Sequence, residues 1–351
     1  MNEKRLSIRK ETFLKRADAL YTFWHNGYDE ALAKVDALVF MVGSDEDAPQ
    51  YSKSNALQTW LFGFEMSDLL SVFTRKRIYF LSSARKVQFF EPIESEEASG
   101  VVPPISLMTR DKVDKDKANF TKFVGILREA GSTFGHFMKD SYNSEFACAW
   151  RNALQENGIE LSVDVSSSFV HLLSAKDEIE VELCKKAAQA TVNTWSHARK
   201  KIVNIVDQSK VQQRLADNHS VEACYTPIIQ SGGDYTLKLS AESNDKLLHY
   251  GTIICSLGAR YQGYCSNLSR TMFVDPPKQF EEIYESMLVI ENAVIESLKP
   301  GRKLCEAYAA GLEVVNGKPE LSDRLIKNNF GFLAIFIISS RAAVIVVVCI
   351  Y

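Results

Sequence analysis

Two polar residues, Ser256 and Asn267, lie where a β-hairpin could hold a pair of divalent metal ions. The segment GTIICSLGARYQGYCSNLSRTMFVD, residues 251–275, contains a β-like run, a turn at Gln262–Gly263 and a second β-like run. This pattern predicts two adjacent antiparallel strands, with Ser256 and Asn267 facing the same region. A two-metal hydrolase needs carboxylates there, because paired Mn²⁺, Co²⁺ or Zn²⁺ ions require anionic oxygen ligands that bridge them. Ser256 and Asn267 are neutral, so the hairpin has the framework of such a site without its ligands.

The composition predicts a globular protein of two domains. The chain has 351 residues, which is long for one core, and 46% of them are hydrophobic, enough to build two. A net charge of −3 gives no general basic field, which argues against tight nucleic-acid binding by bulk electrostatics. Any contact with DNA would therefore be local or supplied by a partner.

The cysteines predict a reducing compartment, the cytosol or the nucleus. The seven cysteines are odd in number and form no CxxC pair, which argues against a disulfide framework and against a zinc ribbon. The first sixteen residues, MNEKRLSIRKETFLKR, are charged and contain no apolar core, so we expect no secretory signal.

The last nineteen residues, Leu333–Tyr351, are apolar and about as long as a membrane span. Arg341 lies at the middle of this segment, where insertion into a bilayer would cost about 2.5–3.5 kcal/mol. We therefore favour a pair of buried strands over a membrane anchor, and expect no membrane partner.

The first half of the chain alternates helices and strands. Apolar residues at helical spacing predict a helix over residues 12–28 that ends at Gly27. Strands are predicted at residues 35–42, 71–73, 77–82, 105–109, 133–138 and 159–165, and further helices at 120–130 and 145–156. Such alternation favours a mixed α/β domain with a partly parallel sheet.

The second half opens on a long amphipathic helix. Its first turn, Asp177-Glu-Ile-Glu180, is typical of an N-cap, and apolar residues follow one stripe as far as Ile202. A strand at 227–233, the hairpin, and helices at 279–299 and 304–315 follow. We therefore divide the chain into a first domain over residues 1–172, a second over 173–332 and a divergent apolar tail over 333–351.

Five long strings of residues carry a resemblance to a known family. They are ALQTWLFGFE at 56–65, YTPIIQSGGDYTLKLS at 225–240, YCSNLSRTMFVDP at 264–276, KPELSDRL at 318–325 and KNNFGF at 327–332. On these strings the second domain resembles the pita-bread fold of creatinase, prolidase and methionine aminopeptidase. The whole chain, over residues 10–332, resembles the amino-terminal region of the large subunit of the FACT histone chaperone. The resemblance implies an α/β (α+β) fold, with a creatinase-like mixed-sheet domain followed by a pita-bread aminopeptidase-like domain that is incomplete at its C-terminus.

The resemblance also implies that the ligands of the peptidases are replaced. Active pita-bread peptidases carry Asp at the positions of Ser256 and Asn267, and a substrate-binding His near the position of Leu239. Their remaining His and Glu ligands would follow residue 328, and this sequence departs from both the peptidases and the chaperone from Leu333 onward. Two divalent ions would then leave uncompensated charge in a poorly solvated site. We expect no metal, no other cofactor and no enzymatic activity.

The function implied by the resemblance is that of a non-catalytic component of FACT in the nucleus, on chromosomes. FACT takes part in nucleosome disassembly and reassembly during transcription, replication and repair. The implied partners are its HMG-box subunit and the core histones, as tetramer-forming and dimer-forming pairs, with nucleosomal DNA contacted only indirectly. The candidate peptide- or histone-binding pocket on the hairpin comprises Arg260, Tyr261, Tyr264, Asn267 and Arg270, although ordinary strand packing explains each of them equally well.

Two alternatives stay open at the level of sequence. The chain could be a metallo-aminopeptidase or a proline dipeptidase with degenerate ligands. It could also be a truncated product without independent function, because residues 333–351 replace what should be a core strand pair, and the loss of that pair would expose apolar sheet surface.

Overall fold

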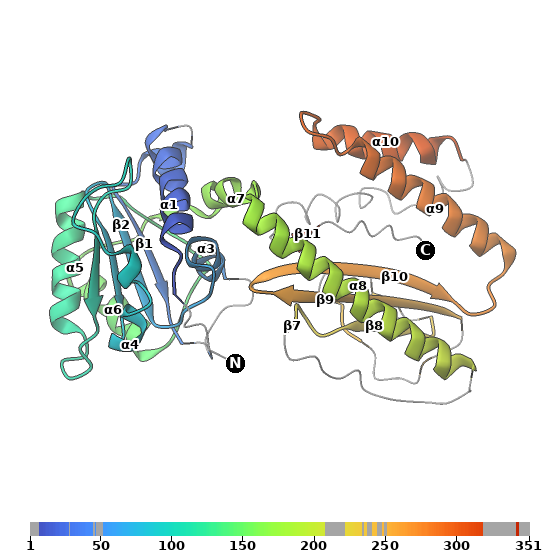
Figure 1. The fold of residues 1–351 in the computed structure, drawn as a ribbon, viewed down its shortest axis with the longest axis horizontal. Coiled ribbons are helices and arrows are strands. Elements are labelled where there is room, and N and C mark those ends of the chain that lie inside the picture. The colour runs from blue at the N-terminus through green and yellow to red at the C-terminus, as the bar shows by residue number, and fades with distance from the viewer. Residues whose placement is uncertain are drawn as a thin grey trace. The chain divides into compact units, whose positions relative to one another are not determined.

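The computed structural model describes residues 7–27, 29–44, 46, 52–207, 222–233, 235–236, 241–243, 248, 251–318 and 342–343. The chain forms two compact units, Met1–Ala175 and Lys176–Tyr351 (Figure 1). The boundary that we predicted after residue 172 falls inside a helix that the sequence pattern did not reveal, α7 (Ser166–Ser174).

The first unit is built on a six-stranded mixed sheet with the strand order β4-β3-β2-β1-β5-β6. Its strands are β1 (Ala37–Val42), β2 (Leu69–Thr74), β3 (Ile78–Ser82), β4 (Ile105–Thr109), β5 (Phe134–His136) and β6 (Val163–Asp164). The central strand β1 pairs antiparallel with β2 and parallel with β5, and β5 pairs parallel with β6. The predicted mixed α/β domain is confirmed, although β6 is shorter than the predicted strand.

Helices cover both faces of this sheet. One face carries α1 (Lys10–His25), α3 (Lys53–Phe62) and α7, and the other carries α5 (Lys117–Ala130) and α6 (Glu145–Glu156) (Figure 1). The described residues of the unit also form the short helical turns α2 (Glu30–Ala33), α4 (Ala84–Val87) and η2 (Glu91–Ile93). Successive strand residues belong to different cores, Leu38 and Phe40 to one and Ala37 and Val39 to the other, because side chains alternate along a strand.

Local sequence explains the ends of α3, the helix that follows β1. The Ser52 hydroxyl accepts a hydrogen bond from the backbone N–H of Asn55 and caps the first turn. Gly63 ends the helix in the left-handed conformation, at φ 89°, which glycine adopts without a steric penalty. The bulky residues between these caps, among them Trp60 and Phe62, are buried in the core.

The second unit contains the predicted hairpin. Its elements are α8 (Glu178–Asp207), β7 (Glu222–Ala223), β8 (Ile228–Ser231), β9 (Thr252–Tyr261), β10 (Tyr264–Phe273), α9 (Lys278–Ser297), α10 (Leu304–Asn316) and β11 (Ala342–Ala343). Gln262 and Gly263 have φ values of 46° and 82°, as a tight two-residue hairpin turn requires. The strands are continuous to this turn and are therefore longer than the runs the sequence suggested. Figure 1 shows α8 lying along the hairpin.

The predicted start of α8 is confirmed by a reciprocal capping box. The Asp177 carboxylate accepts from the Glu180 N–H at 2.8 Å, and the Glu180 carboxylate accepts from the Asp177 N–H at 3.0 Å. Of the predicted tail, only β11 lies within the described residues, and it pairs parallel with β10 at Cys265 and Ser266. Among the described helices, none is long and apolar enough to cross a membrane.

Candidate functional site

The β9–β10 hairpin has two different faces, set by its register. Ser256 pairs with Ser269, and Gly258 pairs with Asn267. Since side chains alternate along a strand, these residues share one side of the hairpin with Arg260. We call this side the polar face; it comprises Ser256, Gly258, Arg260, Asn267 and Ser269. The opposite side is the helix face, which packs on α8; it includes Ile253, Cys255, Leu257, Tyr261, Tyr264, Leu268 and Arg270.

A compact network of neutral hydrogen bonds occupies the polar face. The Tyr225 hydroxyl lies 2.8 Å from the Ser256 hydroxyl and donates to the side-chain oxygen of Asn267. The Ser269 hydroxyl donates to that of Ser256 at 2.8 Å, and Ser256 Oγ lies 3.5 Å from Asn267 Oδ1. The structure thus brings Ser256 and Asn267 together, and their side-chain oxygens hydrogen-bond to one another and to two further hydroxyl groups.

This donor set does not fit a pair of divalent metal ions. Three hydroxyls and one amide oxygen carry no negative charge, whereas paired divalent ions require bridging carboxylates. The amide oxygen of Asn267 already accepts the Tyr225 hydroxyl. Within the described part of the chain, no group of three or more His, Cys, Asp or Glu residues could hold a metal ion.

Two members of the network, Tyr225 and Ser269, were missed by sequence reasoning. Ser269 could have been found, because it lies two residues after Asn267 and therefore on the same face of a strand. Nothing local marks Tyr225, which lies 31 positions from Ser256 in the chain. It reaches the polar face because β8, which begins at Ile228, pairs with β9 and aligns Ile228 with Ser256.

The five residues of the candidate binding pocket are divided between the two faces. Arg260 and Asn267 lie on the polar face. Arg270 pairs with the buried Cys255, and Tyr261 lies opposite Tyr264 with its ring 5.5 Å from the Lys186 ammonium of α8. The predicted pocket is therefore not assembled on one side of the hairpin, because the strand alternation sends Tyr261, Tyr264 and Arg270 toward α8.

Tyr264 is an anchor between the hairpin and α8. It is 1% exposed, and its hydroxyl donates at 3.0 Å to the carboxylate of Glu180, which is also 1% exposed. The same Glu180 closes the capping box of α8. A buried carboxylate that accepts two hydrogen bonds is satisfied, so Tyr264 joins the start of the helix to the turn of the hairpin.

The thiols around the hairpin are held in their neutral form. Burial raises the pKa of Cys255 to about 12. A hydrogen bond to Cys265, together with burial, raises the pKa of Cys224 far above its ordinary value. Neither group supplies a thiolate at neutral pH, so neither adds anionic character to the site. Leu239, the third of the substituted positions, lies outside the described residues.

Two family models divide the chain between them. Residues 8–168 match the FACT complex subunit SPT16 N-terminal lobe domain, and residues 182–333 match metallopeptidase family M24. The FACT complex subunit spt-16 of Caenorhabditis elegans is 41% identical; the match covers 95% of this chain and 34% of that protein. The chain thus spans about a third of the length of the curated relatives it matches.

Solved structures give the same result. The N-terminal domain of FACT complex subunit SPT16 from Cicer arietinum (chickpea) superimposes with a TM-score of 0.80 at 32% identity, covering 92% of this chain and 80% of that one. The prolidase from Pyrococcus horikoshii OT3 matches with a TM-score of 0.60 at 16% identity, covering 88% of this chain and 80% of its own, which shows a shared fold. The chain therefore belongs to the SPT16 family of FACT complex subunits, and it corresponds to their N-terminal domain with its pita-bread peptidase fold.

Proposed function

We propose that this chain is a non-catalytic part of a FACT histone chaperone and that it binds polypeptide through its peptidase-like unit. The observation that carries the proposal is the neutral network of Tyr225, Ser256, Asn267 and Ser269. By the resemblance to the peptidases, Ser256 and Asn267 stand where an active enzyme has aspartates. Without those carboxylates, catalysis by a metal-bound water has no support.

The proposed partners follow from membership in the SPT16 family. They are the core histones, as tetramer-forming and dimer-forming pairs, and the HMG-box subunit of FACT, with nucleosomal DNA contacted only indirectly. The proposed place of action is the chromosome in the nucleus, during transcription, replication and repair. The net charge of −3 is compatible with basic partners and gives no general field for DNA.

The polar face is the part of the hairpin that we assign to binding. It presents the Arg260 guanidinium and the side-chain amide N–H groups of Asn267, which can donate hydrogen bonds to the backbone carbonyls of an extended peptide. Tyr264 has no place in this surface, because it is buried against α8. We therefore narrow the candidate set to Arg260 and Asn267, together with Tyr225.

The enzymatic alternative is tested by metal content and hydrolysis. The purified chain should contain no stoichiometric Mn²⁺, Co²⁺ or Zn²⁺ and should not hydrolyse Xaa-Pro dipeptides, with or without added metal. Stoichiometric metal with metal-dependent turnover that Asn267→Ala abolishes would show that the chain is a peptidase.

The binding proposal is tested by pull-down of the two core histone pairs at several salt concentrations. Arg260→Ala should weaken retention of the preferred pair by at least about tenfold, the loss expected for one charged hydrogen bond. Arg302→Ala is the matched control, because it removes the same charge from an exposed i,i+4 ion pair with Glu306. No retention of either pair near physiological salt would rule out a histone-binding role for this chain.

A further inference from the structure

A cavity of about 600 Å³ lies in the first unit, remote in sequence from the hairpin. It opens beside the carboxyl ends of the adjacent parallel strands β1 and β5. The chain leaves β1 toward α3 on one face of the sheet and leaves β5 toward α6 on the other. A crevice forms at such a divergence, and ligands of open α/β sheets bind in crevices of this kind.

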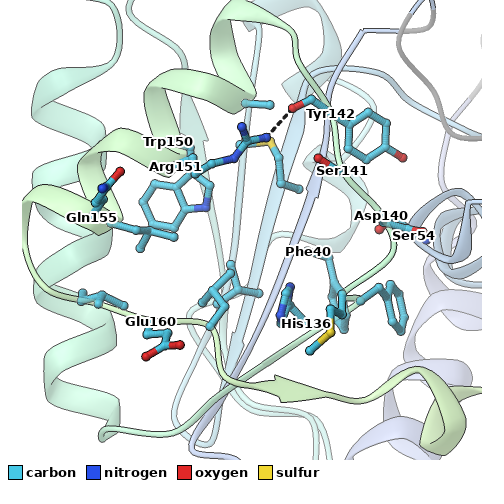
Figure 2. A pocket seen from close by; sticks show the side chains of 18 of the residues that line it. Phe40, Ser54, His136, Asp140, Ser141, Tyr142, Trp150, Arg151, Gln155 and Glu160 are labelled. Atoms are coloured by element: carbon cyan, nitrogen blue, oxygen red, sulfur yellow. Dashed lines mark hydrogen bonds between the residues drawn. The ribbon is translucent and has the colours of Figure 1, made fainter.

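Two polar atoms on the wall of this cavity have no hydrogen-bond partner among the described residues. One is the indole nitrogen of Trp150 on α6, a side chain that is 3% exposed, and the other is Nε2 of His136 at the end of β5. Figure 2 shows both side chains lining the pocket. Buried polar groups without partners are rare in folded proteins, so this pair needs an explanation.

The two atoms differ in hydrogen-bonding character. The indole nitrogen is a donor only. Burial lowers the pKa of His136 below its ordinary value, and the ring also bonds to the backbone of Leu161. Since Nε2 is the unpaired nitrogen, the neutral ring presents it to the cavity as an acceptor. The wall therefore offers one donor and one acceptor.

The surroundings disfavour an anionic ligand. The N-terminus of α3 is an obvious anion site, but Asp140 already occupies it, accepting from the N–H groups of Lys53 and Ser54 at 3.3 and 2.6 Å. On α6, Arg151 donates at 2.6 Å to the carbonyl oxygen of Tyr142 (Figure 2). Among the charged residues that line the cavity, Asp140 and the exposed Glu160 outnumber Arg151, so the lining has a net negative charge that disfavours a phosphate or a carboxylate.

The floor of the cavity is apolar. It is formed by Val39, Met41, Ala147, Leu154, Ile159 and Leu161. A peptide backbone alternates C=O acceptors with N–H donors, and an aliphatic side chain can cover an apolar floor. From this geometry we propose that the cavity binds a short, uncharged, extended peptide segment that places one large aliphatic side chain on the floor and hydrogen-bonds to Trp150 and His136. This site is separate from the polar face of the hairpin, so the proposal does not depend on the function assigned there.

The test is an NMR titration of the full chain with the capped tripeptide acetyl-Ala-Leu-Ala-amide. The indole N–H signal of Trp150, assigned by its absence in Trp150→Phe, should shift downfield and saturate. Trp150→Phe, which keeps a ring beside Phe120 and Phe123, should weaken binding about tenfold, because one buried hydrogen bond is lost. His136→Asn, which retains a donor near Nδ1 but has no group at Nε2, should have a similar effect.

Trp24→Phe is the matched control. Trp24 lies in the other core of the same unit, and its indole N–H already donates to the Val35 carbonyl oxygen at 3.1 Å. Trp24 is not part of the cavity wall, so replacing it should leave peptide binding unchanged. Acetyl-Ala-Asp-Ala-amide should bind at least about tenfold more weakly than the leucine peptide, because its carboxylate is repelled at the rim. Three results would each overturn the proposal. The peptide could leave the indole signal unmoved, or Trp150→Phe could bind the peptide with full affinity. Adenosine, tested as a non-peptide ligand, could produce a saturable shift that the peptide does not.

Discussion

At the scale of single residues, the peptidase-like unit is defined by polar side chains that satisfy one another without charge. Tyr225 contacts both Ser256 and Asn267, and Ser269 completes the network. Each hydroxyl can donate and accept, so the group needs no ion to satisfy its hydrogen-bonding capacity. The network can therefore stabilise the folded hairpin without a bound metal ion.

The double substitution Ser256→Asp with Asn267→Asp should destabilise this network without creating a peptidase. Two adjacent carboxylates beside Tyr225 would repel each other and be partly desolvated, so the free energy of unfolding at neutral pH should fall by about 2 kcal/mol. Their pKa values would be raised in the folded state. The folded protein would then bind more protons than the unfolded chain, and the lost stability should return as the pH falls.

Urea unfolding at pH 7 and at pH 5 measures this effect, alongside Xaa-Pro hydrolysis with added Mn²⁺. Ser256→Asn is the control, because it has the size of aspartate without the charge and should show no such pH dependence. Metal-dependent hydrolysis by the double variant would contradict the prediction, because it would show that the chain holds the remaining metal ligands of an active peptidase.

At the scale of elements, the hairpin depends on close approach at Gly258. A Cβ at this position would lie 2.4 Å from the Ser266 carbonyl oxygen and 3.2 Å from a ring carbon of Tyr225. The first distance is a backbone clash that no side-chain rotation relieves. Gly258 thus allows the two strands to pair and allows the Tyr225 ring to lie over the polar face.

Gly258→Ala should therefore lower the stability of the second unit by about 1–3 kcal/mol, the usual cost of overpacking. Hydrogen exchange should become faster in β9 and β10, and the hydrogen bonds of Tyr225 to Ser256 and Asn267 should weaken. Gly125→Ala is the control, since a Cβ added to this residue of helix α5 would meet no atom within 4 Å. That change should stabilise the helix by about 0.5–1 kcal/mol. Unaltered exchange in the hairpin of Gly258→Ala would contradict the account.

At the scale of the whole molecule, each of the two units has its own apolar core. Phe80 lies in the core of the first unit, 1% exposed, among Phe13, Phe62 and Phe90. The core between α8 and the hairpin is a separate cluster around Ile202, Ile253 and Cys255. A domain with its own core can unfold by itself, so the stability of one unit need not govern the other.

Phe80→Ala should cost the first unit about 3–5 kcal/mol, as expected when a buried aromatic ring is removed. Hydrogen exchange followed by mass spectrometry should show loss of protection in β1, β2 and β3, with protection in β9 and β10 retained. Val113→Ala, at a residue that is 95% exposed, should change neither unit. Equal loss of protection in both units would show that they unfold together.

Local sequence patterns were enough to predict many of the elements, and the five long strings carried the resemblance that identified the family. Helix α6 and strand β4 have the predicted bounds, the hairpin turns at Gln262–Gly263, and α8 begins at the predicted cap, because each depends on residues within a few positions of one another. Which distant residues meet emerged only from the folded chain. Tyr225 reaches Ser256 through the pairing of β8 with β9, and the cavity joins Trp150 of α6 to His136 of β5. Such contacts join residues that are far apart in the sequence, so they depend on tertiary packing, which no local sequence pattern encodes.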